Sequence, residues 1–264
     1  MRYSLTVPHE ESSSQGFGLA TEKYLSEIPS PNAKRFFRQV FSQGIATYTD
    51  RLIAIGFVGL GNVLDLGCGF GQWSVALAKL NRSVDSFDID PERVKILQKI
   101  ALDLSIDNIH AAVRSIDLVR AQQGYDGIFC YSSLYYSDYR NSIPRLAKAL
   151  APGGLLYIGS NDLGWYIYNL LNPHNDSEDF SSRDFALQVI DNSLNLYTRG
   201  IMDPNFPIVT PLNSLIESCE EAGLEVLGHG PDGSVTLNGK KPTSFYRGEY
   251  LGLTSVFEIL CRKR

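Results

Sequence analysis

The sequence predicts an α/β protein built on a doubly wound, mostly parallel β-sheet, and three observations support this. Short apolar runs alternate with helical patterns between about residues 62 and 160, as in a parallel sheet covered on both faces. A glycine-rich turn joins the first apolar run to the first helical pattern. The 264 residues are 44% hydrophobic, enough for a substantial core, so we expect one domain with appendages.

Five strands are expected in this alternating part, at residues 63–66, 83–87, 109–113, 125–131 and 155–158. The helices between them are expected over 72–80, from Pro91 onward, and up to about Leu150. The helix at Pro91 has the clearest start, because Asp90 can cap it and Glu92 lies in its first turn. The run Pro152-Gly153-Gly154 stops the last of these helices.

The C-terminal part adds one helix and two strands. The helix opens with a cap and a proline at Thr210-Pro211 and closes at Gly223. The strands, 224–227 and 255–261, are joined by a polar, glycine-containing connection that suits an antiparallel pair.

Two segments lie outside the alternation and are expected to cover the sheet. Residues 1–55 form an N-terminal helical cover segment, with helical patterns over 21–28 and 33–52. Residues 56–264 form the main domain, which carries an insertion over 161–209 as a substrate cover. Both segments are expected near the carboxyl edge of the sheet, where open α/β folds bind ligands.

The glycine-rich turn has an acid, Asp65, on the strand just before its first glycine. A turn that cradles a pyrophosphate uses backbone N–H groups at a helix N-terminus, and a nearby carboxylate would repel the phosphates. S-adenosylmethionine has no phosphate and carries a sulfonium and an ammonium group, so the acid suits it. Gly67, Gly69 and Gly71 let the backbone approach such a ligand, because a side chain there would occupy the ligand's volume.

The pattern Asp-x-Gly-x-Gly-x-Gly at residues 65–71, with a further acid in Ser86-Phe87-Asp88-Ile89-Asp90-Pro91, resembles the cofactor site of class I S-adenosylmethionine-dependent methyltransferases. The resemblance covers about residues 40–264. It implies a Rossmann-like sheet of seven strands with the last strand antiparallel, plus a helical cover. It also implies that 56–264 is a methyltransferase domain that binds S-adenosylmethionine and methylates a small molecule.

Asp88 is placed to accept hydrogen bonds from both ribose hydroxyls, since a carboxylate at a strand's end has two oxygens facing the neighbouring crevice. Helix capping is the other use of an acid here, and Asp90 is better placed for it. The same contact would serve NAD, so the choice of cofactor depends on Asp65. Cys68 and Ile89, which adjoin these residues, are also expected at the cofactor.

The adenine contact departs from the pattern of the related enzymes. In those enzymes an acid after the third strand often contacts the adenine amino group, and here Arg114 holds that position. Ser115 is expected to accept from the amino group, with Ile116 packed on the ring. Two alternatives stay open: Asp117 makes the contact, or the serine and this acid only form a capped surface turn.

Tyr131 follows the fourth strand, where the resemblance implies the methionine and sulfonium end of the cofactor. Aromatic faces attract cations, so Tyr131 and Tyr135 are candidates for the site, although tyrosines at a strand end also serve as boundary residues. Methyl transfer needs an aligned nucleophile and, where that group carries a proton, a base. His174, in a loop of the insertion, is the candidate base and Tyr135 the second catalytic candidate. The alternative for His174 is a solvated loop histidine.

Composition excludes several partners. The formal net charge is −5, and no run of Lys and Arg interleaved with aromatic residues occurs, so nucleic acid is not expected. The four cysteines lie far apart, which predicts neither a metal site nor a disulfide scaffold. No apolar run approaches about 18 residues and the N-terminus lacks an apolar signal core, so we expect no membrane contact and a soluble, cytoplasmic protein. The oligomeric state is not predicted.

The expected function is transfer of a methyl group from S-adenosylmethionine to an oxygen or nitrogen of a small organic molecule by direct nucleophilic displacement. The aromatic run 161–171 and the rings of Phe17, Tyr24, Phe36 and Phe37 suggest an apolar or aromatic pocket for that molecule. Two alternatives are a catalytically silent scaffold or regulator that binds the same cofactor, and a nicotinamide-dependent oxidoreductase. The latter conflicts with Asp65 and lacks a recognisable Tyr-x-x-x-Lys pair.

Overall fold

The computed structural model describes residues 17, 22–120 and 124–264, with the side chain of His174 outside that description. Its strands are β1 (Asn62–Leu66), β2 (Ser83–Asp88), β3 (Ile109–Val113), β4 (Tyr125–Tyr131), β5 (Leu150–Asn161), β6 (Leu224–Pro231), β7 (Glu249–Tyr250), β8 (Leu253–Thr254) and β9 (Val256–Lys263). Seven of them form one sheet in the order β3-β2-β1-β4-β5-β9-β6. Strand β9 runs antiparallel to its neighbours, β5 and β6, and the other neighbouring pairs in this sheet are parallel. The predicted fold class is confirmed.

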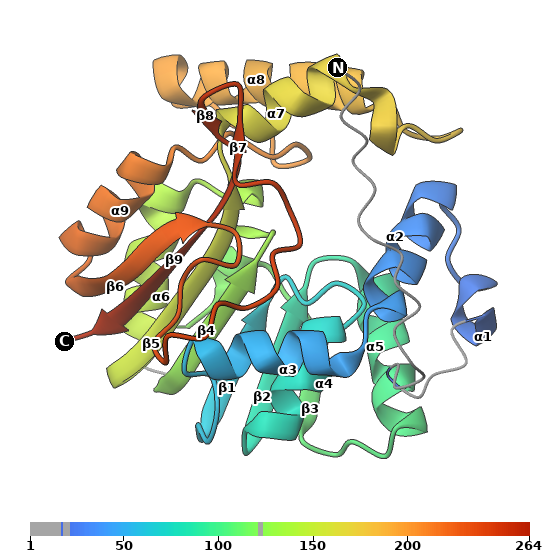
Figure 1. Cartoon of the computed structure of the whole chain (residues 1–264), viewed down its shortest axis with the longest axis vertical. Helices are drawn as coiled ribbons and strands as arrows, with labels where there is room; N and C mark the ends of the chain where they lie inside the picture. The colour runs from blue at the N-terminus through green and yellow to red at the C-terminus, as the bar shows by residue number, and fades with distance from the viewer. Residues whose placement is uncertain (1–16, 18–21, 121–123) are drawn as a thin grey trace.

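Helices cover both faces of this sheet (Figure 1). They are α1 (Glu22–Leu25), α2 (Pro31–Ser42), α3 (Ile45–Ala54), α4 (Gln72–Leu80), α5 (Pro91–Asp103), α6 (Tyr139–Ala149), α7 (Leu163–Leu171), α8 (Ser182–Arg199) and α9 (Leu212–Glu221), with 3-10 turns η1 (Ile116–Leu118), η2 (Leu134–Tyr136) and η3 (Pro173–Asn175). One core cluster packs α2 to α5 on the sheet, and a second packs α6 and α9 on the other face. Because α7 directly follows β5, it lies at the carboxyl edge of the parallel strands.

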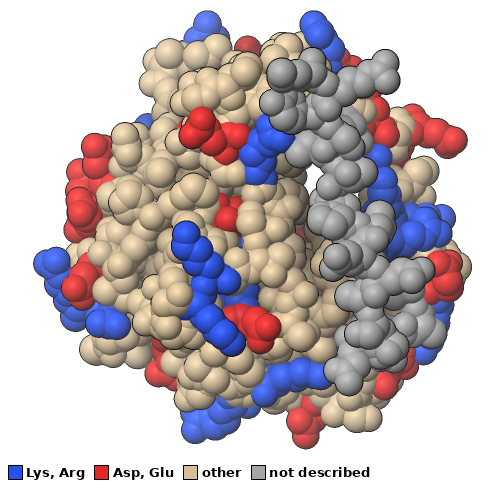
Figure 2. Space-filling model, in the orientation of Figure 1, with Lys and Arg blue, Asp and Glu red and all other residues tan. Residues whose placement is uncertain are grey.

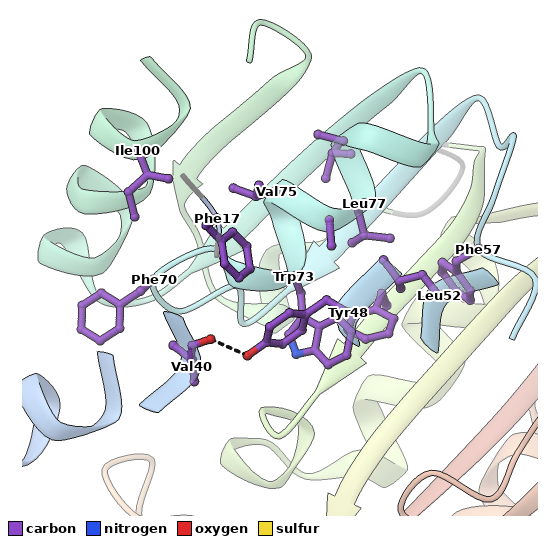
Figure 3. Packing of buried hydrophobic residues seen from close by; sticks show 14 of the residues in the cluster. Phe17, Val40, Tyr48, Leu52, Phe57, Phe70, Trp73, Val75, Leu77 and Ile100 are labelled. Carbon is purple, nitrogen blue, oxygen red and sulfur yellow. Dashed lines mark hydrogen bonds between the residues drawn. The ribbon is translucent and has the colours of Figure 1, made fainter. Parts of the chain in front are cut away.

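The first core cluster fixes α3 against α4, the helix that follows the glycine turn. The ring of Tyr48 in α3 lies edge-to-face on Trp73 in α4, with 4.7 Å between ring centroids. The Tyr48 hydroxyl donates to the carbonyl of Val40 at 2.7 Å, which leaves no unsatisfied polar atom on the ring. Figure 3 shows these residues packed together with Phe57 and Leu52. The N-terminal helices are therefore integral to the core on this face.

The N-terminal helical patterns are shorter than expected. The expected helix over 33–52 is two helices, α2 and α3, separated at Gln43 and Gly44. Both residues have extended backbone, with ψ angles of 141° and 145°, so the chain turns between the helices. Helix α1 covers only part of the expected 21–28.

Strand β5 begins earlier than expected, at Leu150 instead of residue 155. Helix α6 ends at Ala149, close to the expected end near Leu150, but the run Pro152-Gly153-Gly154 that was expected to stop it lies inside the strand. The pairing of β5 with β4 shifts register between Tyr125 and Gly127, which accommodates the irregular stretch.

The expected cap of the last helix, Thr210, is wrong. Thr210 is fully buried and its hydroxyl pairs with that of Ser160 at 3.1 Å. Asp162 serves the helix start instead, because its Oδ2 accepts from the backbone N–H of Leu212 at 3.0 Å. Helix α8 and the β7–β8 hairpin were not expected from the sequence.

The surface carries both signs of charge. On the face in Figure 2, outside the grey atoms, Lys and Arg side chains are interspersed with Asp and Glu. Within the described ranges, no helix is long and apolar enough to cross a membrane.

Candidate functional site

The glycine turn between β1 and α4 has a backbone that only glycine adopts readily. Gly67, Gly69 and Gly71 have φ angles of 74°, 55° and 92°. A Cβ at Gly67 would lie 2.2 Å from Cβ of Ser133, and one at Gly71 would lie 2.1 Å from Cδ1 of Leu97. A Cβ at Gly69 would meet no described atom within 4 Å. The outer glycines therefore serve close packing, and the middle one faces open space.

Asp65 lies beneath this turn, near the end of β1. The residue is 2% exposed, and its Oδ2 accepts from the hydroxyl of Ser74 in α4 at 2.6 Å. Burial raises the pKa of Asp65 from 3.8 to about 7; the hydrogen bond from Ser74 opposes this rise, and the charge of Asp88 adds to it. The site thus contains an acid that changes its charge near neutral pH.

Asp88, at the end of β2, shapes the glycine turn. Its Oδ2 accepts from the backbone N–H of Gly69 at 2.8 Å, and its Oδ1 accepts from that of Asp90 at 2.9 Å. Each carboxylate oxygen keeps capacity for a further hydrogen bond. Asp90 caps α5 as predicted, since it accepts from the backbone N–H groups of Glu92 and Arg93. Asp88 is therefore not the cap, and it stands beside the open space at Gly69.

The residues expected at an adenine ring lie on the next two strand ends. Ile89 is 61% exposed and adjoins Asp88. The guanidinium of Arg114 lies 4.5 Å from the ring centroid of Phe87 in β2. Ser115 accepts from the backbone N–H of Asp117 at 3.2 Å and so caps η1, which is the capped turn that the sequence left as an alternative. Neighbouring Ile116 packs against the second core cluster. The adenine contact stays a prediction.

Tyr131 belongs to a line of aromatic rings that leads away from the glycine turn. Its ring centroid lies 5.2 Å from that of Trp73 and 6.5 Å from that of Tyr246, and Tyr246 lies 5.6 Å from Trp165 of α7. Gly159 makes room for it, because a Cβ there would lie 2.5 Å from Cδ2 of the tyrosine. Burial raises the pKa of Tyr131 well above its ordinary value.

The other candidate side chains differ in what they can do. Burial raises the pKa of the Tyr135 hydroxyl well above 10, so at neutral pH this group is a hydrogen-bond donor and not a base. His174 lies in η3, at the end of α7, but its side chain is outside the described part of the chain. Burial also raises the pKa of the Cys68 thiol, which makes this thiol unreactive.

Two segments that are distant in sequence meet beside the carboxyl edge of the sheet. Arg35 of α2 donates hydrogen bonds to the backbone carbonyls of Asn175 and Asp176, the latter at 2.9 Å. Asp179 accepts from the hydroxyl of Ser30 and from the backbone N–H of Asn32. Helix α2 is thus tied to the segment that follows α7.

A buried ionic network adjoins Tyr131, and sequence reasoning missed it. Arg51 of α3 pairs with Asp232 at 2.5 Å and with Glu258 of β9 at 2.6 Å, and all three side chains have no exposed area. The hydroxyl of Tyr157 accepts from Arg51 at 2.8 Å and donates to Glu258. One signal was present in the sequence: a glutamate inside the apolar run 256–261 is a charge in a strand expected to be buried.

A surface groove of about 940 Å³ lies elsewhere, between α6 and α9. It is on the sheet face opposite Asp65, and its lining includes Arg140, Lys148 and Glu217. The residues of the glycine turn take no part in it, so it is separate from the candidate site.

Known proteins match the part of the chain that contains the glycine turn. A family model described as a methyltransferase domain matches residues 63–154. The ubiquinone biosynthesis O-methyltransferase of Xanthomonas campestris pv. campestris (strain B100) is 34% identical over 101 residues, which are 37% of this chain and 42% of that protein. The enzyme of the same name from Bordetella avium is 27% identical over 169 residues, 63% of each chain. The matches therefore span less than two thirds of these relatives.

Solved structures resemble a larger share of the fold. A geranyl diphosphate methyltransferase in complex with S-adenosylmethionine has a TM-score of 0.58 at 14% identity, covering 95% of this chain and 98% of that one. A methyltransferase from Clostridium acetobutylicum has a TM-score of 0.59 at 15% identity, covering 87% and 96%. The 4+2-cyclase SpnF has a TM-score of 0.56 at 15% identity, covering 84% and 82%. Residues 63–154 thus match a methyltransferase domain, and the fold of the whole chain resembles that of S-adenosylmethionine-dependent methyltransferases.

Proposed function

We propose that this protein transfers a methyl group from S-adenosylmethionine to an oxygen or nitrogen of a small organic molecule. One observation carries the proposal: the open space at Gly69 is bordered by Asp88, whose two carboxylate oxygens each keep acceptor capacity. The methyltransferase-domain match and the two O-methyltransferase relatives support the same reaction class.

The residues of the site fit this cofactor. When bound, S-adenosylmethionine supplies a methyl group on a positively charged sulfur. Asp88 would accept from the ribose hydroxyls, and ionised Asp65 would favour the cationic methionine end. The ring face of Tyr131 would attract the positive charge in the same region. Ile89, with Ser115 and Ile116, is proposed to hold the adenine.

The protein's part in the displacement is to align the acceptor and to exclude water. We propose that residues 1–55 and the insertion 161–209 provide the cover, which the ties between α2 and the segment after α7 support. The Tyr135 hydroxyl keeps its proton and would orient the acceptor by donating a hydrogen bond. His174 remains the proposed base for an acceptor that must lose a proton.

Two alternatives lead to different measurements. The first alternative is a scaffold or regulator that binds the cofactor without transferring a methyl group. The resemblance to a cyclase favours it, because one fold can serve several functions. The second alternative, a nicotinamide-dependent oxidoreductase, conflicts with the position of Asp65 beneath the glycine turn. Calorimetric titration with S-adenosylmethionine, and with NADH as control, tests the nicotinamide alternative. Micromolar binding of the former alone supports the proposal, and binding of NADH alone contradicts it.

Methyl transfer itself needs a second measurement. Incubation with methyl-labelled S-adenosylmethionine and a panel of phenols and amines is expected to yield a labelled small molecule. Cofactor binding without transfer to any member of the panel would favour the scaffold.

Asp88→Ala is expected to weaken S-adenosylmethionine binding by about 2 kcal/mol, roughly 30-fold in Kd, because hydrogen bonds to a charged group are lost. Calorimetry on the folded variant measures this. Asp85→Ala is the matched control, since Asp85 lies on the same strand and pairs with Tyr125 at 2.6 Å, away from the glycine turn. Equal affinities for Asp88→Ala and wild type would contradict the ribose assignment.

The affinity for S-adenosylmethionine is expected to rise about tenfold between pH 6 and pH 8 through Asp65, because a carboxyl group with a pKa of about 7 ionises in this range. Asp65→Asn removes this contribution and leaves only the ligand's own titration as the baseline. Calorimetry of both proteins across the pH range provides the test. Parallel profiles for wild type and variant would show that Asp65 does not interact with the ligand.

The same residue makes a prediction for stability. Its folded-state pKa lies above the unfolded value, so its favourable contribution is complete below about pH 3.9 and is lost as the pH rises to about 7. The free energy of unfolding of the wild type, relative to Asp65→Asn, is therefore expected to fall across this window. Urea titrations at several pH values measure the difference.

We further propose that the protein works in the cytoplasm on a small acceptor and not on nucleic acid. The four cysteines, all of which lie in the described ranges, are free and buried, as in a reducing compartment. The mixed charges of the visible face and the net charge of −5 support the choice of acceptor.

A further inference from the structure

Three half-buried rings from separate parts of the chain form a continuous aromatic surface next to the glycine turn. Tyr131 ends β4, Tyr246 lies in the loop between β6 and β7, and Trp165 lies in α7. Their successive ring centroids are 6.5 and 5.6 Å apart, within the range of aromatic contacts. Each of the three residues is partly buried.

Asp232 connects two of these parts. It is 4% exposed overall, its side chain has no exposed area, and it follows directly on β6. Its carboxylate accepts hydrogen bonds from the hydroxyl of Tyr131 at 2.9 Å, an Arg51 N–H at 2.5 Å, the backbone N–H of Phe245 at 2.6 Å, that of Tyr246 at 3.1 Å and the hydroxyl of Ser244 at 3.3 Å. Oδ1 thus binds Tyr131, at the end of β4, and Arg51, and Oδ2 binds the loop segment 244–246.

We propose that Asp232 is a positioning residue, which holds Tyr131 and the segment 244–246 together as one wall of a methyl-acceptor site for a planar aromatic molecule. The proposal rests on the proposed function, because the wall begins at the glycine turn where the cofactor would lie. Trp73, in the first turn of α4, provides that continuity through its contact with Tyr131 at 5.2 Å.

The charge of Asp232 is what the arrangement requires. An ionised carboxylate accepts on both oxygens, whereas an asparagine amide has one accepting oxygen and one donating nitrogen. Asparagine at this position must therefore lose either the bonds from the loop N–H groups or those from the Tyr131 hydroxyl and Arg51. Arg51, buried beside it, compensates the negative charge, and its guanidinium lies 5.1 Å from the Tyr131 ring and 5.2 Å from the Phe245 ring.

The chemistry of the wall indicates an aromatic acceptor. Its members are aromatic rings that contact one another in offset or edge-to-face geometry. Such rings bind a further flat aromatic ring more strongly than a saturated ring of equal size. The pair 2-naphthol and decahydro-2-naphthol tests this distinction, because the two molecules share a hydroxyl and a two-ring skeleton and differ in planarity.

The experiment is calorimetric titration of each probe into the full-length protein saturated with S-adenosylhomocysteine. Wild type is expected to bind 2-naphthol at least fivefold more tightly than the saturated probe. Asp232→Asn is expected to lower the affinity for 2-naphthol about tenfold and to reduce the preference to less than twofold. Its affinity for S-adenosylhomocysteine is expected to stay within twofold of the wild-type value.

The controls reproduce the same chemistry at the other end of the sheet. Tyr125 donates to Asp85 at 2.6 Å, so Tyr125→Phe and Asp85→Asn remove a matched tyrosine–aspartate bond. Neither is expected to alter the preference between the two probes. Tyr131→Phe keeps the ring and loses only the bond to Asp232, and a decrease of about threefold in 2-naphthol affinity is expected. This variant decides the matter if Asp232→Asn does not fold.

The outcomes separate two kinds of failure. A wild type that does not bind S-adenosylhomocysteine would overturn the proposed function and this proposal with it. A wild type that binds it but shows no preference for 2-naphthol would overturn the aromatic acceptor site alone. An unchanged preference in folded Asp232→Asn, or an unchanged 2-naphthol affinity in Tyr131→Phe where that variant alone folds, would leave the carboxylate with a purely structural role.

Discussion

Arg51→Met is expected to lower the free energy of unfolding by about 4 kcal/mol, because removal of one partner leaves buried charges uncompensated. Methionine fills a similar volume without the guanidinium, so Asp232 and Glu258 lose the only cation that a described contact gives them. They must then bind protons or draw water into the core. Urea denaturation of wild type and variant at pH 7 measures the difference.

The matched control for this prediction is Arg140→Met. Arg140 pairs with Asp138 at 2.8 Å, but its side chain is 45% exposed, so the loss is expected to stay within about 1 kcal/mol. The double variant Arg51→Met/Glu258→Gln is expected to recover part of the loss, because one of the two unpaired carboxylates is gone. Equal stability losses for Arg51→Met and Arg140→Met would contradict the account of the network.

Gly69→Val is expected to abolish S-adenosylmethionine binding, with a loss of at least about 100-fold in affinity. The structure leaves open space where the side chain would go, and this is the space proposed for the cofactor. Calorimetry on the folded variant measures the affinity. A valine with a positive φ also strains the backbone by about 1–2 kcal/mol, so stability must be measured in parallel.

Gly200→Val separates the strain from the steric block. Gly200 has a φ of 71° and no described atom within 4 Å of an added Cβ, so it reproduces the conditions of Gly69 at the end of α8. Both variants are expected to lose similar stability, but only Gly69→Val should lose the ligand. Cofactor binding at wild-type strength by folded Gly69→Val would overturn the location of the site.

Local signals in the sequence predicted the part of the fold that carries the turn. The bounds of α4, β3 and β4 agree with the expected 72–80, 109–113 and 125–131. Glycine, proline and acid residues mark these boundaries, and their effects depend only on near neighbours in the chain. The capping role of Asp90 was predictable for the same reason, since a cap is read from the residues that follow it.

Features that depend on distant pairs were not predictable. Nothing in the sequence near Arg51 indicates that it is buried in an ionic network. Its partners Asp232 and Glu258 lie 181 and 207 residues further along the chain. The loop that supplies Tyr246 to the aromatic line gave no periodic signal either. Thr210 carried a valid capping signal, but burial against Ser160 took its hydroxyl. In these cases tertiary contacts override local preference.

The long separation between Arg51 and its partners has a consequence for biosynthesis. The helix that carries this arginine leaves the ribosome well before β6 and β9, so the arginine has neither carboxylate as a partner until those strands follow. Since contacts between distant segments form late and slowly, the glycine turn can be complete in the nascent chain while the wall beside Tyr131 is not. By this reasoning, synthesis of the segment that contains Asp232 and Glu258 is the step that completes the network around Arg51.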